Sequence, residues 1–69
     1  MEREYVQSSM ITSIGYDPTT STLEIEFSTG AVWQYFDFPE NLYYEFKTGS
    51  IGKYWHSVVR GQYTESRVG

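Results

Sequence analysis

One stretch decides the fold of this chain: Thr22-Leu23-Glu24-Ile25-Glu26-Phe27-Ser28-Thr29-Gly30-Ala31-Val32-Trp33-Gln34-Tyr35-Phe36. In its first half, apolar residues at 23, 25 and 27 alternate with two glutamates, which predicts a strand with one buried and one solvated face. Ser28–Gly30 then predicts a tight hairpin, because glycine tolerates the positive φ that such turns need. The ring-rich second half predicts the next antiparallel strand.

The chain before this stretch predicts one more strand. From Ser8 onward, alternate positions share one predicted face, with Gly15 permitting a kink or bulge: Met10, Thr12, Ile14 and Tyr16. Residues 17–21 predict a turn, because Pro18 pre-sets φ and the flanking Asp and Ser can bond the local backbone. Residues 1–7 are read as a polar lead-in.

Two short helices are predicted after the third strand, which is expected to run from Ala31 to Asp37. Pro39 suits the first position of a helix, with Asp37 as the cap before it. Apolar residues at helical spacing then continue as far as Gly49: Leu42, Tyr43 and Phe46. Ser50 predicts the cap of a second helix that ends at Gly61, with apolar positions Ile51, Tyr54 or Trp55, Val58 and Val59.

The sequence therefore predicts an α+β fold, a three-stranded antiparallel β-meander followed by two short α-helices. A single domain is expected over residues 8–63, with residues 64–69 as a C-terminal tail. The alternative is a fourth strand at residues 58–64, because Val58 and Val59 are β-branched.

Composition limits how the chain can be stabilised and where it works. It has 69 residues and no cysteine, so disulfides and thiolate zinc sites are excluded, and its single histidine cannot anchor a metal site. The core must rest largely on two Trp, seven Tyr and four Phe. There is no apolar run of about 18 residues and the N-terminus is charged, so neither a membrane span nor a signal peptide is predicted. We expect a cytoplasmic protein without a cofactor.

Charge is unevenly distributed along the chain. The net charge is −4. Residues 1–46 carry eight acids against Arg3, whereas residues 47–69 carry four cations against Glu65. An acidic protein is an unusual nucleic-acid binder, because phosphate contacts supply most non-specific affinity. The basic C-terminal third keeps that ligand class open, and ordinary solvated helix-face charges are the alternative.

Catalytic chemistry is poorly represented. His56 is the only imidazole, and no nucleophile motif or nucleotide-binding loop accompanies it. Glu24 and Glu26 share a strand face, but a flat solvated face does not shift carboxylate pKa values. Ser50-Ile51-Gly52-Lys53 could contact a phosphate at a helix start, or it could simply be a serine cap followed by a glycine that permits close packing. We therefore expect a protein that is not an enzyme.

A combination of aromatic rings and cations is the pattern by which single-stranded nucleic acids are bound. On the third strand, Trp33 and Tyr35 supply the rings. The second helix supplies both rings and basic groups: Lys53, Tyr54, Trp55, His56 and Arg60. These seven are the candidate nucleic-acid-binding residues. Because so small a core needs most of its rings, we expect the Trp33 and Tyr35 face to be at least partly buried under the helices.

The order of these motifs resembles the KTSC domain. The resemblance spans residues 8–63 and rests on Ser8-Ser9, Ile14-Gly15-Tyr16-Asp17, residues 23–27, Gly30, residues 33–37, Pro39, Ser50-x-Gly52-Lys53-Tyr54-Trp55 and Arg60-Gly61-Gln62-Tyr63. The family's Tyr-x-Tyr motif falls on residues 33–35, so Trp33 replaces the first Tyr and its hydroxyl is lost. His56 stands where Asn is common. KTSC domains occur as stand-alone bacterial proteins and at the C-terminus of some lysyl-tRNA synthetases.

The resemblance implies RNA binding through that synthetase association and brings no established biochemical activity with it. We expect a non-enzymatic binding module with RNA as the leading ligand class. The alternative is a protein-interaction or homodimerisation module, with surplus rings forming the interface. Neither a membrane nor a metal partner is expected.

Overall fold

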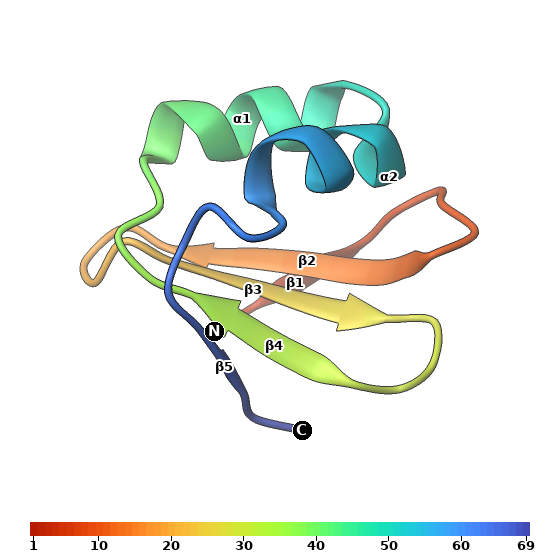
Figure 1. Ribbon diagram of the computed structural model, residues 1–69, viewed down its shortest axis with the longest axis horizontal. Helices are drawn as coiled ribbons and strands as arrows, with labels where there is room; N and C mark the ends of the chain where they lie inside the picture. Colours follow the sequence, from red (N-terminus) through yellow and green to blue (C-terminus); the bar gives the residue numbers. More distant parts are fainter.

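A computed structural model describes all residues, 1–69, as two layers: a sheet and a layer of helices that covers one of its faces (Figure 1). In chain order the elements are β1 (Arg3–Tyr5), β2 (Ile11–Asp17), β3 (Thr22–Phe27), β4 (Val32–Tyr35), α1 (Glu40–Thr48), α2 (Ile51–Tyr54), the π-helical turn η1 (Trp55–Val59) and β5 (Glu65–Arg67). The α+β class is confirmed.

The sheet has five antiparallel strands in the order β1-β2-β3-β4-β5, so the predicted three-stranded meander is wrong. The two added strands come from segments read as a lead-in and a tail. Both are three residues long, polar and exposed. They are edge strands held by pairing with β2 and β4, and an edge strand needs no apolar alternation. The alternative strand at 58–64 is also wrong, because Val59 is helical and fully buried.

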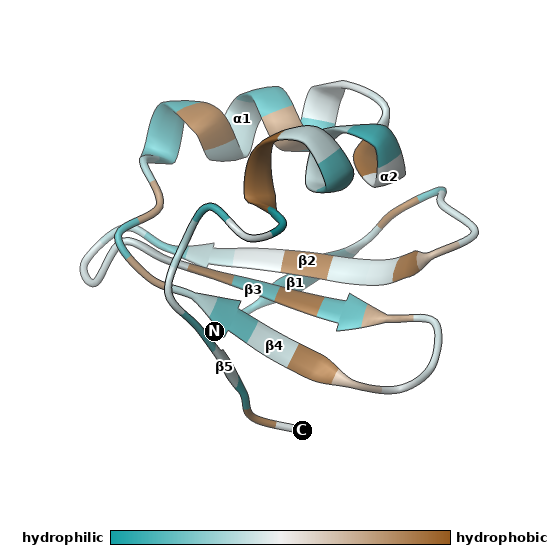
Figure 2. Ribbon diagram, in the orientation of Figure 1, coloured by the Kyte–Doolittle hydropathy of each residue, from teal (hydrophilic) through white to brown (hydrophobic).

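The core lies between the sheet and the helices. It consists of ten buried side chains: Ile11, Ile14, Leu23, Ile25, Tyr35, Phe38, Tyr43, Phe46, Ile51 and Val59. Figure 2 shows the hydrophobic and hydrophilic positions alternating along β3, as its sequence predicts. On the open face of the sheet the side chains bond one another. Glu24 accepts from Gln34 Nε2 (2.9 Å) and pairs with Arg3 (3.5 Å), and Glu26 accepts from the Ser13 hydroxyl (2.9 Å).

A β-bulge in β2 changes which residues face the core. The register shifts between Ile11 and Ser13, so Ile11 and Ile14 both become fully buried. A bulge inserts one extra residue and breaks the period of two. The predicted alternating set therefore holds for Ile14 and Tyr16 but misses Ile11, and the bulge lies before Gly15.

Turns and helix ends match the sequence in part. In the turn at residues 17–21, Asp17 accepts a hydrogen bond from the Thr19 amide (2.9 Å), as expected. In the hairpin that follows β3, Gly30 has the expected positive φ, +95°. The start of α1 differs from prediction, because Pro39 is the N-cap and Asp37 adopts a φ of +56° without capping the helix. Ser50 stands at the N-cap of α2, but its side chain makes no capping hydrogen bond.

Gly15 allows β1 to lie against β2. A Cβ at this position would stand 2.5 Å from the Glu2 carbonyl oxygen and 2.9 Å from Arg3 Cγ. The first contact is with backbone, which cannot swing aside as a flexible side chain can. The absence of a side chain at Gly15 is therefore what permits the β1 edge.

We predict that Gly15→Ala lowers the free energy of unfolding by about 1–3 kcal/mol, because overpacking displaces β1. Urea denaturation followed by far-UV circular dichroism measures this loss. The matched control is Gly52→Ala, where the nearest atoms lie at an ordinary 3.5 Å, and which should be neutral or stabilising because alanine favours the helix. Equal stabilities for the two variants would contradict the role of Gly15.

Candidate nucleic-acid interface

The side chains of Trp33 and Tyr35 point toward the helices. In the register of the sheet, Trp33 pairs with Ile25 and Tyr35 pairs with Leu23, and both partners are core residues. Tyr35 is only 1% exposed, while Trp33 is partly buried against the core. The predicted burial of this face is therefore confirmed. A side chain as buried as Tyr35 does not offer its ring to a base, so we assign it no stacking role.

Tyr35 instead positions another ring. Its hydroxyl accepts a hydrogen bond from the indole Nε1 of Trp55 (3.3 Å). Burial raises the pKa of Tyr35, a shift that the Trp55 hydrogen bond opposes and that the nearby Glu65 carboxylate increases. The hydroxyl therefore stays protonated at neutral pH and holds the edge of the Trp55 indole.

Trp55 forms one wall of a hollow of about 270 Å³ between β4 and η1. We call this the Trp55 hollow; its lining is Phe27, Trp33, Tyr35, Trp55, Arg60 and Glu65. The indole meets the Phe27 ring edge to face at 5.2 Å between centroids. The Arg60 guanidinium lies 5.9 Å from the Trp55 centroid, within range of a cation–π interaction. The hollow thus combines aromatic walls with a cation at its rim.

The π-helical turn explains why Arg60 lies over Trp55. The Arg60 amide donates to the Trp55 carbonyl oxygen, five residues earlier, at 2.8 Å. Such a turn is wider than an α-helical one. π-Helical turns are rare in proteins as a whole, and those that occur are often found at functional sites. His56 borders the same rim, with Nδ1 3.4 Å from Arg60 Nη1 and its ring 5.1 Å from that of Trp55.

Lys53 and Tyr54 lie elsewhere. The Tyr54 ring packs on Phe46 at 5.4 Å between centroids, and its hydroxyl is buried without a hydrogen-bond partner. Tyr54 is partly buried and packs against the core, and its role as a stacking ring stays a prediction. Lys53 is exposed and lines a separate hollow of about 250 Å³ with Ser50 and Ser57. Of the seven candidates, the structure brings together Trp33, Tyr35, Trp55, His56 and Arg60.

Three residues near the Trp55 hollow are not among the seven candidates: Phe27, Glu65 and Arg67. Arg67 pairs directly with Trp33 across β4 and β5, so it lies on the same face of the sheet. Polar Glu65-Ser66-Arg67 carries no strand signal, so only the pairing of β5 reveals this neighbour. The alternation of Phe27 with Ile25 predicts that Phe27 lies on the core face of its strand, and the structure places it there.

The cations divide into paired and unpaired sets. Arg3 and Lys47 form the two ion pairs of the protein, with Glu24 and Glu4 respectively. Lys53, Arg60 and Arg67 form no ion pair with an acidic side chain, and Arg67 Nε donates a hydrogen bond to the Gly69 main-chain oxygen (2.8 Å). The unpaired cations are therefore all in the C-terminal third of the chain, and two of them flank the tryptophans.

Two other features bear on function. No group of three or more His, Cys, Asp or Glu side chains is arranged to hold a metal ion. None of the helices has the length and apolar character needed to cross a bilayer.

Comparisons with known proteins agree over nearly the whole chain. The KTSC domain family matches residues 7–63. An uncharacterized protein of Stutzerimonas stutzeri is 36% identical over 91% of this chain and 90% of its own length. A lysine–tRNA ligase of a Nostoc species is 36% identical over 83% of this chain, which spans only 10% of that ligase. The crystal structure of a KTSC domain protein from Yersinia pestis superposes with a TM-score of 0.96 at 36% identity, covering 99% of this chain and 97% of the other.

We predict opposite effects for two Tyr→Phe variants. Tyr35→Phe removes the acceptor of the Trp55 indole and should cost about 1 kcal/mol of unfolding free energy. Tyr54→Phe removes a buried hydroxyl that has no partner, so it should be neutral or stabilising by up to about 1 kcal/mol. Urea denaturation measures both changes, and the NMR signal of the Trp55 indole N–H should shift only in Tyr35→Phe. A larger loss for Tyr54→Phe than for Tyr35→Phe would contradict this assignment.

We also predict that stability falls at alkaline pH. Burial raises the pKa of Tyr35, Tyr43 and Tyr54 above the ordinary value of 10.0, so the folded state holds these protons more tightly than the unfolded chain. The stability that these protonated hydroxyls give the folded state is complete below pH 10. It is lost as the pH rises through the folded-state pKa values, and the free energy of unfolding falls by at most about 1.4 kcal/mol per pH unit for each tyrosine. Denaturation at pH 9, 10 and 11 tests this, and Tyr35→Phe should show a shallower decline than the parent.

Proposed function

The chain belongs to the KTSC domain family, and we propose that it is a non-enzymatic binding module that holds single-stranded RNA at the Trp55 hollow. The observation that carries the proposal is the half-buried Trp55 indole with an unpaired guanidinium beside it. Every base has a π-face, and stacking on an accessible ring contributes about 1–3 kcal/mol per base.

The surroundings of the hollow supply the phosphate contacts that such binding needs. Arg60 stands at the rim and Arg67 is the strand neighbour of Trp33, and neither cation is neutralised by an ion pair. Binding a phosphate therefore breaks no existing ion pair. Glu65 lines the same hollow and opposes a closely approaching phosphate, which favours a bound base inside the hollow with its phosphates at the rim.

The distribution of charge reconciles an acidic protein with a nucleic-acid ligand. The excess of acids lies in the first 46 residues, and both cations that pair with acids anchor β1, at the opposite edge of the sheet from β5. An approaching strand of RNA is repelled at the β1 edge and attracted at the β5 edge. The orientation of binding follows from this asymmetry.

The lysine–tRNA ligase relatives support the same ligand class. In them a segment similar to this chain makes up one-tenth of a protein named for its action on a tRNA. A small segment of that kind suits an added RNA contact, and the relatives support a cytoplasmic setting. The carboxylates on the open face, Glu24 and Glu26, are occupied by hydrogen bonds, which supports a role in binding over one in catalysis.

The second candidate is a protein-interaction or homodimerisation module. It is favoured by two short, exposed edge strands and by Tyr5 of β1, which is 84% exposed. Unpaired strand edges can add a strand from another chain. Sedimentation distinguishes this candidate, because a homodimer has twice the 8.1 kDa mass of the chain.

We predict that a labelled single-stranded RNA binds at low salt and that affinity falls steeply as salt rises. Arg60→Ala and Arg67→Ala should each lower the slope of log K against log salt by about 0.7, because one phosphate contact is lost. Trp55→Ala should weaken binding about 5- to 150-fold. Fluorescence anisotropy measures all of these.

The matched control is Arg3→Ala, which removes the same charge from the opposite edge and should leave the slope unchanged. Lys53→Ala tests whether the neighbouring hollow contributes a further phosphate contact. The proposal fails if no anisotropy change is seen at low salt with tens of micromolar protein. It also fails if Arg3→Ala and Arg60→Ala have equal effects.

A further inference from the structure

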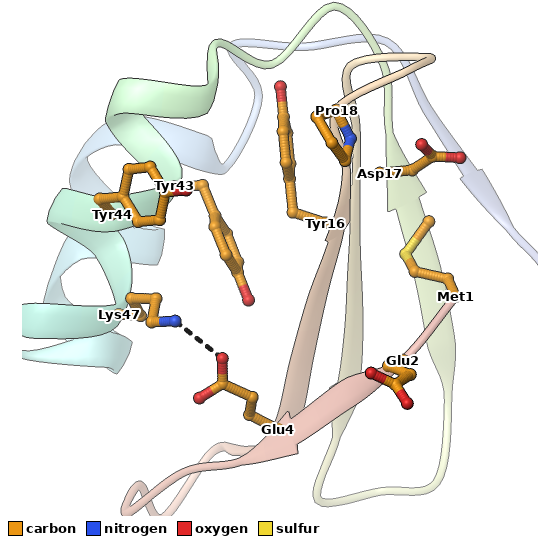
Figure 3. Close-up of a pocket in the computed structure, with 9 residues that line it drawn as sticks. All are labelled: Met1, Glu2, Glu4, Tyr16, Asp17, Pro18, Tyr43, Tyr44 and Lys47. Atoms are coloured by element: carbon orange, nitrogen blue, oxygen red, sulfur yellow. Dashed lines mark hydrogen bonds and ion pairs between the residues drawn. The ribbon is translucent and has the colours of Figure 1, made fainter.

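The largest hollow of the protein lies at the other edge of the sheet, between β1 and α1. Its volume is about 550 Å³, and Figure 3 shows the side chains that surround it. α1 contributes Tyr43, Tyr44 and Lys47, while β1 and its start contribute Glu4 and Glu2. We call it the β1–α1 hollow. None of the predicted nucleic-acid-binding residues lines it.

Three tyrosine rings form its aromatic wall. Tyr16 of β2 stacks on Tyr43 with 5.1 Å between centroids and 18° between planes. The Tyr16 hydroxyl donates to the Phe38 carbonyl oxygen, which fixes that ring. Tyr44 lies beside Tyr43 at 6.0 Å and is 53% exposed, so its face is available at the rim. Two of the rings are thus held rigidly and one is open to a ligand.

The chain's own lysine demonstrates what this wall accepts. Lys47 Nζ lies 5.4 Å from the Tyr43 centroid, 5.9 Å from the Tyr44 centroid and 2.7 Å from Glu4 Oε1. Figure 3 shows it reaching from α1 to Glu4. The hydrogen bond to Glu4 raises the pKa of Lys47. An ammonium group is therefore held here by two rings and a carboxylate, the combination that recognises organic cations.

The hollow keeps negative charge that Lys47 does not neutralise. Glu2 and Asp17 also line it, and neither forms an ion pair. Asp17 accepts only the Thr19 amide of its own turn. The hollow is thus lined by three carboxylates and two ammonium groups, those of Lys47 and of the Met1 N-terminus, which leaves an excess of one negative charge near an aromatic wall.

We propose that the β1–α1 hollow receives the basic side chain, arginine or lysine, of a protein partner. Charge complementarity identifies the occupant: the excess of one carboxylate favours a cation, and the tyrosine faces prefer one carried on an organic stem. Lys47 competes with the incoming side chain, because its ammonium already stands over two of the rings. This site is independent of the RNA-binding proposal, since it uses the opposite edge of the sheet.

The test uses a single basic side chain as its probe, so that multivalent attraction to an acidic protein does not contribute. N-acetyl-arginine methylamide is titrated into the full chain and followed by NMR chemical shifts. We expect saturable shifts at Tyr16, Tyr43 and Tyr44 and none at Trp55. The uncharged isostere N-acetyl-citrulline methylamide should cause no saturable shift.

Two pairs of variants with equal net-charge changes locate the site. Lys47→Gln should tighten binding about two- to fivefold because the competing ammonium is removed, while Lys53→Gln, on another surface, should not. Glu2→Gln combined with Asp17→Asn should weaken binding about fivefold, while Glu45→Gln combined with Glu65→Gln, neither of which lines this hollow or forms an ion pair, should not. Asn and Gln preserve side-chain shape, and asparagine can still accept the bond that stabilises the turn.

Several results would overturn the proposal. Equal effects of Lys47→Gln and Lys53→Gln would show that only net charge matters. Saturable binding of the citrulline derivative would show that the cation is not recognised. A sedimentation mass near twice 8.1 kDa that Glu2→Gln with Asp17→Asn abolishes would assign the hollow to a second copy of the chain.

Discussion

Burial of one sheet face beneath two short helices is the constraint on which the rest of this structure depends. A chain of this size can remove only about 60% of its unfolded surface from water, and here neither disulfides nor a metal can help. Ile14, Ile25, Leu23 and Tyr35 supply the sheet side of the core, and Phe46, Ile51 and Val59 supply the helix side. The β2 bulge adds Ile11 to the same face. The bulge thus adds to the buried apolar area.

The need for a core also explains how the aromatic residues are divided. Tyr35 and Tyr54 contribute their rings to the interior, whereas Trp55 is only half covered because it stands at the margin between η1 and the sheet. The Tyr35 hydroxyl links the interior rings to the half-covered Trp55 ring, because it lies in the core and accepts the hydrogen bond of the Trp55 indole at the margin. In this protein the second position of the family's Tyr-x-Tyr motif is therefore buried and positions the neighbouring Trp55 ring.

The two edges of the sheet differ in chemistry although they have similar architecture. At the β1 edge, Arg3 and Lys47 are neutralised by glutamates and two further carboxylates stay unpaired. At the β5 edge, Arg60 and Arg67 are unpaired beside tryptophans. A single small domain thus presents an acidic tyrosine hollow and a basic tryptophan hollow on opposite edges. The two proposals assign these hollows to unlike partners, an RNA strand and a basic protein segment.

The amino-acid sequence by itself determined the α+β class, the three central strands, the Gly30 hairpin, the two helical segments and the burial of the Trp33 and Tyr35 face. These features depend on local period and on turn chemistry, both of which can be read along the chain. Only the tertiary structure decided that Arg3–Tyr5 and Glu65–Arg67 are strands, because exposed edge strands are defined by pairing with distant residues and carry no apolar pattern. The tertiary structure also decided that Arg60 lies over Trp55, through a π-helical turn that no residue preference predicts. It placed Lys53 away from the Trp55 hollow. Contacts between residues distant in sequence arise from packing, and packing is settled only when the whole core forms.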